Sequence, residues 1–272
     1  MQDADQENLR NSILCLHVFS ANCGSMQFHV TSYFMPGALK NPIKRLPLDC
    51  PAAADVSIEV KAMTWDHVSV WHSVVQPIIN ANYQHDAVGV DERNVRADAG
   101  WDWTFNYALT LLHNSARILP RNVSGPARAL TVTITSAAGV EIPVGLLTVV
   151  PSFQCNVGNV AGKRAFAWYL ADAPKEFYTR LGISAIKGVA RTLVDSAVQS
   201  GFDVGGAGNT LLHADPKGGK KLHDFYLIGC GMTQVHVHNG AISVLRRNNP
   251  NQYYHMDAPT ALKFTSRFDP RR

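Results

Sequence analysis

The spacing of apolar residues along the chain changes several times between a period of two and a period of three to four. Residues 56–61 alternate apolar and polar side chains, which predicts a half-buried strand. From Trp65 the apolar positions recur every three or four residues and end within 77–82, which predicts a helix. The same spacing predicts a second helix over 103–118, which Pro120 ends.

After Gly125 the pattern changes to that of strands and turns. Residues 129–136 and 142–150 predict a hairpin with Gly139 in its turn, and an aromatic-rich strand follows over 164–171. Further along, the pattern predicts a helix over 188–200, a strand over 209–213, a helix over 219–228 and a final strand pair, 232–238 with 241–246. The expected fold is a mixed α/β domain with meandering strands early and a crossover helix late.

The first 55 residues differ from the rest in their pattern of apolar residues and prolines. Short apolar stretches at 13–19 and 28–34 predict two strands, and prolines then recur through residue 51. We therefore expect an N-terminal extension, residues 1–55, followed by one domain over 56–272. The extension could extend the sheet, cover a binding cleft or make an oligomer contact, such as that of a homodimer.

Composition narrows the class of protein. The chain has 272 residues, of which 46% are hydrophobic and 17% charged, enough for one large domain with an extension. No apolar run reaches the roughly 20 residues of a membrane span. The acidic N-terminus lacks the positive charge of a secretory signal, and five cysteines without a C-x-x-C pair fit neither a disulfide framework nor a zinc site. These features predict a cytoplasmic protein without a membrane partner.

The predicted helix at 188–200 opens with a sequence suited to anions, Lys187-Gly188-Val189-Ala190-Arg191. Gly188 and Ala190 are small enough to let a pyrophosphate approach the backbone. The first N–H groups of a helix are unpaired donors at the positive end of its dipole. Lys187 and Arg191 add positive charge. The alternative is an ordinary helix start with a glycine.

Three segments, Leu170–Pro174, Lys187–Val194 and Leu211–Met232, resemble the GNAT superfamily of N-acetyltransferases in residues and in order. The resemblance implies a central mixed β-sheet flanked by helices and acetyl-CoA as co-substrate, with direct attack of a primary amine on the thioester. It also implies that the strand near Trp168 splays from the next strand and holds the pantetheine arm. The implied coenzyme-binding residues are Leu170, Ala171, Asp172, Lys187, Gly188, Val189, Ala190, Arg191 and Tyr226. The sequence departs from the family at Ala185, where Gln or Arg is common, and in its long connection from Pro174 to Gly188.

The resemblance also suggests catalytic residues. Tyr226 corresponds to a tyrosine that protonates the departing thiolate, and its alternative role is a buried aromatic on an amphipathic helix. The strand 165–171 has no carboxylate or imidazole to serve as base. The base could be Asp172 or His213, as well as Glu141, Asp215 or a water chain. Each of these residues has an alternative structural role, such as turn capping.

Other signals are weaker. His236 and His238 could pair on a metal, but no third ligand is evident, so we expect no metal. The glycine-containing segments 158–164 and 205–208 fit turns better than nucleotide loops. Asp102, between Trp101 and Trp103, could hold a cationic acceptor or cap a helix.

Lys and Arg outnumber Asp and Glu after Lys187, and Arg246, Arg247, Arg267, Arg271 and Arg272 contribute to this excess. A solvated basic face fits this pattern better than a nucleic-acid site.

The sequence thus favours an acetyl-CoA-dependent N-acyltransferase. The missing strand carboxylate keeps a second reading open, a non-catalytic acyl-CoA-binding sensor or partner-binding module. A nucleic-acid binder is a third. The amine acceptor could be a polyamine, an aminoglycoside-like amine, an amino acid, a peptide N-terminus, a protein lysine or an aminoacyl-tRNA.

Overall fold

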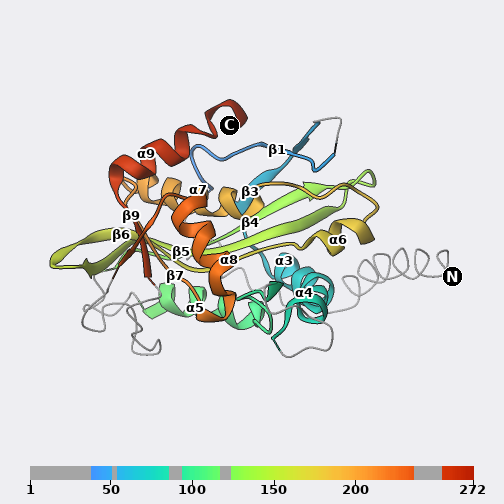
Figure 1. Ribbon diagram of the computed structural model, residues 1–272, viewed down its shortest axis with the longest axis horizontal. Helices are drawn as coiled ribbons and strands as arrows, with labels where there is room; N and C mark the ends of the chain where they lie inside the picture. Colours follow the sequence, from blue (N-terminus) through green and yellow to red (C-terminus); the bar gives the residue numbers. More distant parts are fainter. Residues whose placement is uncertain (1–37, 51–53, 86–93, 117–123, 236–252) are drawn as a thin grey trace. The chain divides into compact units, whose positions relative to one another are not determined.

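A computed structural model describes residues 38–50, 54–85, 94–116, 124–235 and 253–272 (Figure 1). The chain divides into two compact units, Met1–Tyr33 and Phe34–Arg272, and all described residues belong to the second. The strands predicted at 13–19, 28–34 and 241–246, the pair His236 and His238, and the dipeptide Arg246-Arg247 lie outside the described residues.

A seven-stranded mixed sheet forms the centre of the second unit (Figure 1). Its strand order is β3-β4-β5-β6-β7-β9-β8, and only β6 and β7 are parallel. The strands are β3 Glu59–Ala62, β4 Arg128–Thr135, β5 Glu141–Val157, β6 Val160–Asp172, β7 Thr210–His213, β8 Thr233–Val235 and β9 Tyr253–Met256. The predicted mixed α/β fold is confirmed, including the early meander and the late crossover from β6 to β7.

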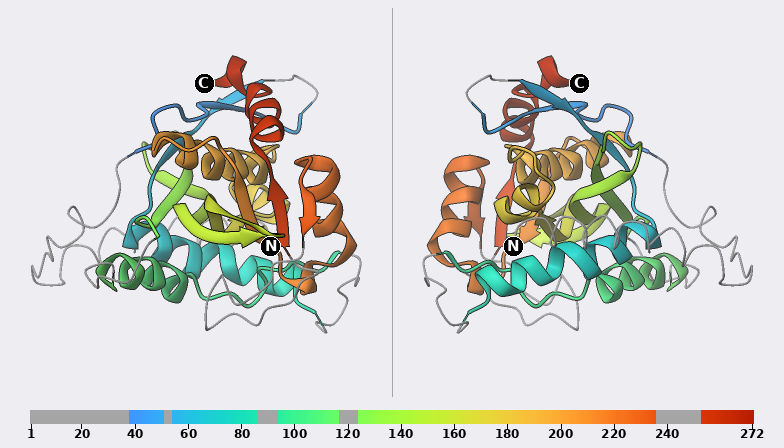
Figure 2. Two further views of the ribbon diagram at one scale, coloured as in Figure 1. Left: turned by 90° about the vertical axis from the view of Figure 1, so that its left-hand side faces the viewer. Right: turned by 90° about the vertical axis from the view of Figure 1, so that its right-hand side faces the viewer.

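Helices lie on both faces of this sheet (Figures 1 and 2). On one face lie α3 Trp65–Val70, α4 Gln76–Tyr83 and α5 Trp103–Ala116, with the π-helical turn Trp71–Val75 joining the first two. On the other face lie α7 Val189–Asp203 and α9 Ala258–Ser266. The crossover helix α7 packs closely on β5, because a Cβ added at Gly145 would stand 2.7 Å from Cγ1 of Val189.

The sequence pattern did not predict four elements: the helix α6 Lys175–Arg180, the helix α9, the strand β9 and the short strand β1 Arg45–Pro47. The described part of the predicted final strand pair is β8, which pairs with β9; its predicted partner, 241–246, lies outside the described residues. Tyr253, Tyr254 and Met256 of β9 are all buried, so this strand lacks the alternation that identifies a half-buried strand.

The segment 38–50 is part of the same hydrophobic core as the sheet. Leu39, Ile43 and Leu46 are buried in it, and β1 pairs with β2 Asp55–Ser57. The segment also holds the turn before α7, because the N–H of Lys187 donates to the carbonyl of Pro47 at 2.8 Å. A short extra sheet and a brace for α7 are therefore the observed roles of this part of the chain.

The side chain of Arg272 is buried, whereas the expected solvated basic face would leave it in water; Arg267 is exposed as expected. The Arg272 guanidinium donates to the Asp195 carboxylate of α7 at 2.7 and 3.1 Å, and its side chain is only 7% exposed. Arg267 lies over the Phe264 ring at 5.8 Å. The sequence could not show this because an isolated arginine near a chain end has no pattern that reveals a distant carboxylate.

No helix in the described ranges has the length and apolar character needed to cross a bilayer.

Candidate functional site

The two parallel strands at the centre of the sheet separate part of the way along. β6 pairs with β7 over Ala165–Ala167 and Thr210–Leu212, and β6 then continues to Asp172 without a described strand on that edge. A β-bulge lies where the pairing ends. Thr148 of β5 is opposite Tyr169, whereas Val149 is opposite Ala167, so Trp168 is the extra residue. A bulge bends its strand and increases its twist, which accounts for the separation. The bulge and the end of the β6–β7 pairing thus lie near Trp168, where the resemblance implies that the strand splays.

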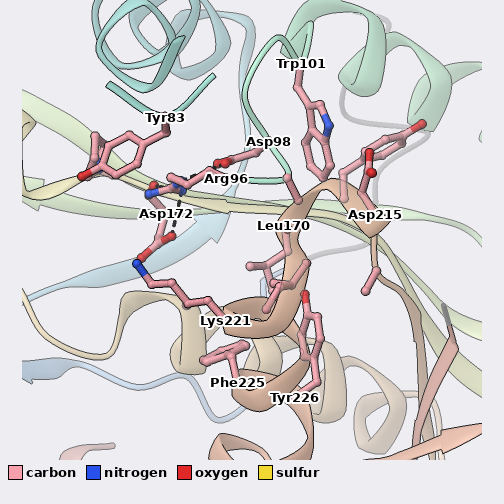
Figure 3. Close-up of a pocket in the computed structure, with 18 of the residues that line it drawn as sticks. Tyr83, Arg96, Asp98, Trp101, Leu170, Asp172, Asp215, Lys221, Phe225 and Tyr226 are labelled. Carbon is pink, nitrogen blue, oxygen red and sulfur yellow. Dashed lines mark hydrogen bonds and ion pairs between the residues drawn. The ribbon is translucent and has the colours of Figure 1, made fainter. Parts of the chain in front are cut away.

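A cavity of about 440 Å³ occupies this opening. It reaches both sides of the sheet (Figure 3). Tyr83, Arg96, Asp98 and Trp101 line one side, and Lys221, Phe225 and Tyr226 line the other. Trp168, Tyr169 and Leu170 of β6 and Leu212 and His213 of β7 form the walls between them. Two ligands could thus approach from opposite faces and meet between the strands.

The first turn of α7 lies at this cavity through Ala190. Gly188 caps the helix with φ of +89°, a left-handed conformation that favours glycine. No acceptor elsewhere in the described chain takes a hydrogen bond from the N–H of Val189, Ala190 or Arg191. These donors are open to an anion.

The side chains around this turn have different settings. Lys187 forms an exposed ion pair with Asp49 at 2.7 Å, and Arg191 is exposed. The Val189 and Ala171 side chains are buried in the core, so only their backbones could contact a coenzyme. Among the implied coenzyme residues, Leu170, Asp172, Ala190 and Tyr226 line the cavity.

Tyr226 extends into the cavity from the π-helical turn Phe225–Gly229, which continues the helix α8 Gly219–Asp224 (Figure 3). Such wide turns are frequent at functional sites. The ring packs on Tyr254 with centroids 5.2 Å apart, and Tyr254 in turn contacts Nδ1 of His223 at 2.6 Å. The Tyr226 hydroxyl has no hydrogen-bond partner among the described residues. Burial raises the pKa of Tyr226, so its proton is retained near neutral pH.

Asp172 is held at the end of β6 by an arginine that the sequence analysis did not identify. Nη2 of Arg96 donates to Oδ1 of Asp172 at 3.0 Å and to its carbonyl oxygen at 2.7 Å. Asp98 binds the same guanidinium through both carboxylate oxygens, at 2.8 and 2.7 Å. The Asp172 side chain keeps 36% of its surface accessible because it lines the cavity. Burial nevertheless raises the pKa of its carboxyl, against the lowering effect of Arg96.

The other base candidates are in different places. His213 ends β7 and lines the cavity, and its ring lies 5.0 Å from that of Tyr253. Asp215 also lines the cavity but caps a 3-10 turn by accepting from the N–H of Lys217. Glu141 is outside the cavity lining and binds Lys61 at 3.1 Å and His67 at 2.8 Å.

Aromatic residues line the side of the cavity next to α5. Trp101 meets Tyr169 edge to face at 5.3 Å, and the buried Trp103 packs against both. Asp102 caps α5 by accepting from the N–H groups of Thr104 and Phe105, so its structural role is observed. Trp101, unlike Asp102 and Trp103, lines the cavity.

Sequence reasoning missed Arg96, Asp98, Tyr83 and Tyr178. They lie in or next to a polar loop or on short helices, where no periodic pattern marks them. Tyr178 of α6 lines the cavity, and its buried hydroxyl has no partner in the described chain. The glycines at 205–208 follow α7 as a loop, and Gly158 lies in the β5–β6 hairpin turn, as predicted.

No protein-family model and no curated protein sequence matches the chain. Among solved structures, a tyrosine-to-phenylalanine mutant of the toxin AtaT bound to the C-terminus of the antitoxin AtaR and acetyl-CoA is 15% identical, with a TM-score of 0.39, and the match covers 76% of this chain and 98% of that one. A KacTA–DNA complex is 13% identical with a TM-score of 0.39, covering 78% of this chain and 99% of that one. AtaTR bound with acetyl-CoA is also 13% identical, with a TM-score of 0.39 and coverage of 76% and 96%. These similarities are distant, and the proposals below rest on the geometry of this chain.

Proposed function

We propose that the chain is an acetyl-CoA-dependent N-acetyltransferase that acetylates a primary amine by direct attack. The observation that carries this proposal is the bulge-induced opening between β6 and β7, with one cavity reaching both faces of the sheet. A transferase that forms no covalent enzyme intermediate needs its two substrates to meet at one point. The resemblance in Leu170–Pro174, Lys187–Val194 and Leu211–Met232 supports the same activity.

The residues around the opening fit acetyl-CoA. The unpaired N–H groups at Val189, Ala190 and Arg191 would bind the pyrophosphate, and Arg191 would add charge. The resemblance assigns the pantetheine arm to the end of β6, where Leu170 and Asp172 line the cavity, so the arm would lie along this end of the strand. Backbone N–H groups there would polarise the thioester carbonyl.

The chemistry requires one proton donor and one proton acceptor. The amine nitrogen forms a bond to the carbonyl carbon, the carbon–sulfur bond breaks, and the departing thiolate takes a proton. Tyr226 would supply that proton, because burial keeps its hydroxyl protonated. Asp172 or His213, which both line the cavity, would take the proton of the attacking ammonium directly or through water.

Calorimetric titration of acetyl-CoA tests the donor site. We expect the wild type to bind and Ala190→Glu to lose binding, because a carboxylate in the first turn of α7 would repel the pyrophosphate. Glutamate suits the first turn of a helix, so this variant should fold. It is a better probe than Gly188→Glu, because the left-handed φ at Gly188 would strain any side chain.

The matched control is Thr260→Glu, which adds the same charge to the first turn of α9, outside the cavity lining. It should bind as the wild type does. Equal acetyl-CoA binding by Ala190→Glu and the wild type would show that the coenzyme does not bind at the start of α7. A wild type that does not bind acetyl-CoA would contradict the proposed function.

The non-catalytic reading makes a different prediction. A sensor would bind acetyl-CoA yet acetylate no amine, and the absence of a carboxylate within 165–171 motivates that alternative.

A further inference from the structure

Arg96 and Asp98 form a clamp on Asp172 at the wall of the cavity (Figure 3). Nη2 of Arg96 donates to Oδ1 of Asp172 at 3.0 Å and to the carbonyl oxygen of the same residue at 2.7 Å. Nε and Nη2 of Arg96 also donate to the two carboxylate oxygens of Asp98, at 2.8 and 2.7 Å. One guanidinium thus fixes both the side chain and the backbone of Asp172, the last residue of β6.

The clamp is itself held by its neighbours. The Asp98 side chain is only 6% exposed, and its carbonyl oxygen accepts from the side-chain amide of Gln76 at 2.9 Å. The Arg96 guanidinium lies over the Tyr83 ring at 5.7 Å, and the Tyr83 hydroxyl donates to Glu176 of α6 at 2.8 Å. Fork-shaped pairing of arginine with carboxylate gives geometric specificity as well as energy. The clamp therefore connects α4 and α6 to the end of β6 in one defined arrangement.

The charges of the clamp leave Asp172 able to bind a proton. An arginine alone beside a carboxylate lowers its pKa and makes it a weak base. Burial raises the pKa of Asp172, Arg96 lowers it, and Asp98 raises it again. A hydrogen bond from the backbone N–H of Asp172 itself also lowers this pKa. Asp98 thus offsets the charge of Arg96, so that Arg96 orients the Asp172 carboxylate without removing its basicity.

We infer that Arg96 and Asp98 are positioning residues for Asp172, which takes the proton of the attacking ammonium. This inference rests on the proposed function, because it chooses between the two candidate bases of the same cavity. A proton of the ammonium passes to an Asp172 carboxylate oxygen, directly or through water, and the freed lone pair forms the bond to the thioester carbon. Asp172 then releases the proton to solvent. Arg96 and Asp98 line the side of the cavity opposite Tyr226, so the proton acceptor and the proton donor would flank the reacting carbon.

Other groups that titrate or carry charge also reach this cavity. They are Tyr83, Tyr169, Lys175, Tyr178, His213, Asp215, Lys221 and Tyr226. Burial raises the pKa of Tyr83 to about 12, and it raises the pKa of Tyr178 and Tyr226 further, so these three hydroxyls stay neutral between about pH 5 and pH 9. Lys175 and Lys221 are exposed, so solvent weakens their effect on Asp172. Within the described residues, the ion pair to Asp172 is therefore the one from Arg96.

The test measures kcat/KM against pH at saturating acetyl-CoA, with whichever of spermidine, kanamycin and glycinamide is acetylated. The acidic limb of this profile reports the ionisation of the base in the free enzyme, and one amine used throughout keeps the amine pKa constant. Asp98→Asn removes a negative charge that disfavours ionised Asp172, so the limb should move to lower pH by about one to three pH units. Arg96→Gln removes the cation, so the limb should move to higher pH by a similar amount.

Two further variants separate charge from position. Arg96→Lys keeps the charge but lacks the fork, so it should leave the limb nearly in place and lower kcat/KM by about ten- to one-hundred-fold. Asp203→Asn is the matched control for Asp98→Asn. Asp203 is likewise buried and paired with an arginine, Arg128 at 2.7 Å, but it does not line the cavity. The control should keep the wild-type position of the limb.

An acidic limb that stays in place in Asp98→Asn and Arg96→Gln would overturn the inference, as would shifts in the same direction. So would a limb that His213→Gln abolishes and Asp98→Asn does not move, since His213 would then be the base. Asp98→Asn decides the matter if Arg96→Gln does not fold.

A second readout separates this inference from the proposed function. Carbon-13 NMR of aspartate carboxyl groups, with the Asp172 signal assigned from Asp172→Asn, follows the same titration without turnover. Opposite shifts of this signal in Asp98→Asn and Arg96→Gln would support the clamp even if no amine is acetylated. Acetylation of an amine without these shifts would overturn the inference and leave the proposed function intact.

Discussion

Replacing Arg272 with methionine should destabilise the protein far more than the loss of a surface arginine usually does. Arg272 donates two hydrogen bonds to the buried Asp195 carboxylate and others to the carbonyl oxygens of Asn41 and Thr265. The Asp195 side chain is 1% exposed, so the variant would leave a buried carboxylate without its cation. Breaking such a pair from one side costs about 3–5 kcal/mol of unfolding free energy.

The pH dependence gives this prediction a second readout. Burial raises the pKa of Asp195 to about 6, against the lowering effect of Arg272. Since the folded-state pKa lies above the unfolded value of about 3.9, the folded state binds the proton more tightly, and stability falls as pH rises through this window. Removing Arg272 would raise the folded pKa further. The loss of stability should therefore be larger at about pH 7.5 than at about pH 5.

Urea unfolding of the wild type and Arg272→Met at both pH values measures the effect. Adding Asp195→Asn to Arg272→Met removes the unpaired charge and should restore more than half of the lost stability. A loss below about 1 kcal/mol, the range of surface ion pairs, would refute the reasoning. So would a loss that is the same at both pH values.

Three further predictions concern the cavity and its supports. Tyr226→Phe should lower kcat by about 10²-fold or more with little change in acetyl-CoA affinity, since only the proton donor is lost; unchanged turnover would remove Tyr226 from the mechanism. Tyr178→Phe should leave the unfolding free energy unchanged or raise it, by up to about 1–3 kcal/mol, because the buried hydroxyl it removes has no partner among the described residues. Tyr107→Phe removes a hydroxyl bonded to the Met63 carbonyl and should be destabilising by comparison; the reverse order in urea unfolding would contradict this account. Gly145→Ala should cost about 1–3 kcal/mol and weaken acetyl-CoA binding by displacing Val189 at the start of α7, whereas Gly162→Ala, with contacts no closer than 3.4 Å, should do neither.

Periodic apolar spacing was sufficient to predict most elements of the sheet and the long helices. The helices near Trp65 and Trp103 and the hairpin at Gly139 have clear periods, and the structure places them as expected. β9 could not be predicted in this way, because its residues are buried on both faces and do not alternate. The single helix expected from Trp65 is interrupted by a π-helical turn, which leaves the apolar spacing almost unchanged.

The site was only partly predictable for a different reason. Tyr226 and Ala190 lie within the segments that resemble the GNAT superfamily. The structure brings both to one cavity with Leu170 and Asp172. The clamp on Asp172 joins Arg96 to a residue 76 positions away, and no local pattern encodes such a contact. The bulge at Trp168 was equally hidden, because one extra residue in a strand changes the register without changing composition.

Hydrogen–deuterium exchange with and without acetyl-CoA tests the central claim most directly, because it reports where along the chain the coenzyme binds. The account predicts slower exchange at the amides of 168–172, at the end of β6, and of 188–192, at the start of α7. The glycine loop at 204–209, at the other end of α7, should be unaffected. Protection confined to that loop, or protection that spares both predicted segments while acetyl-CoA is bound, would contradict the placement of the coenzyme between β6 and β7.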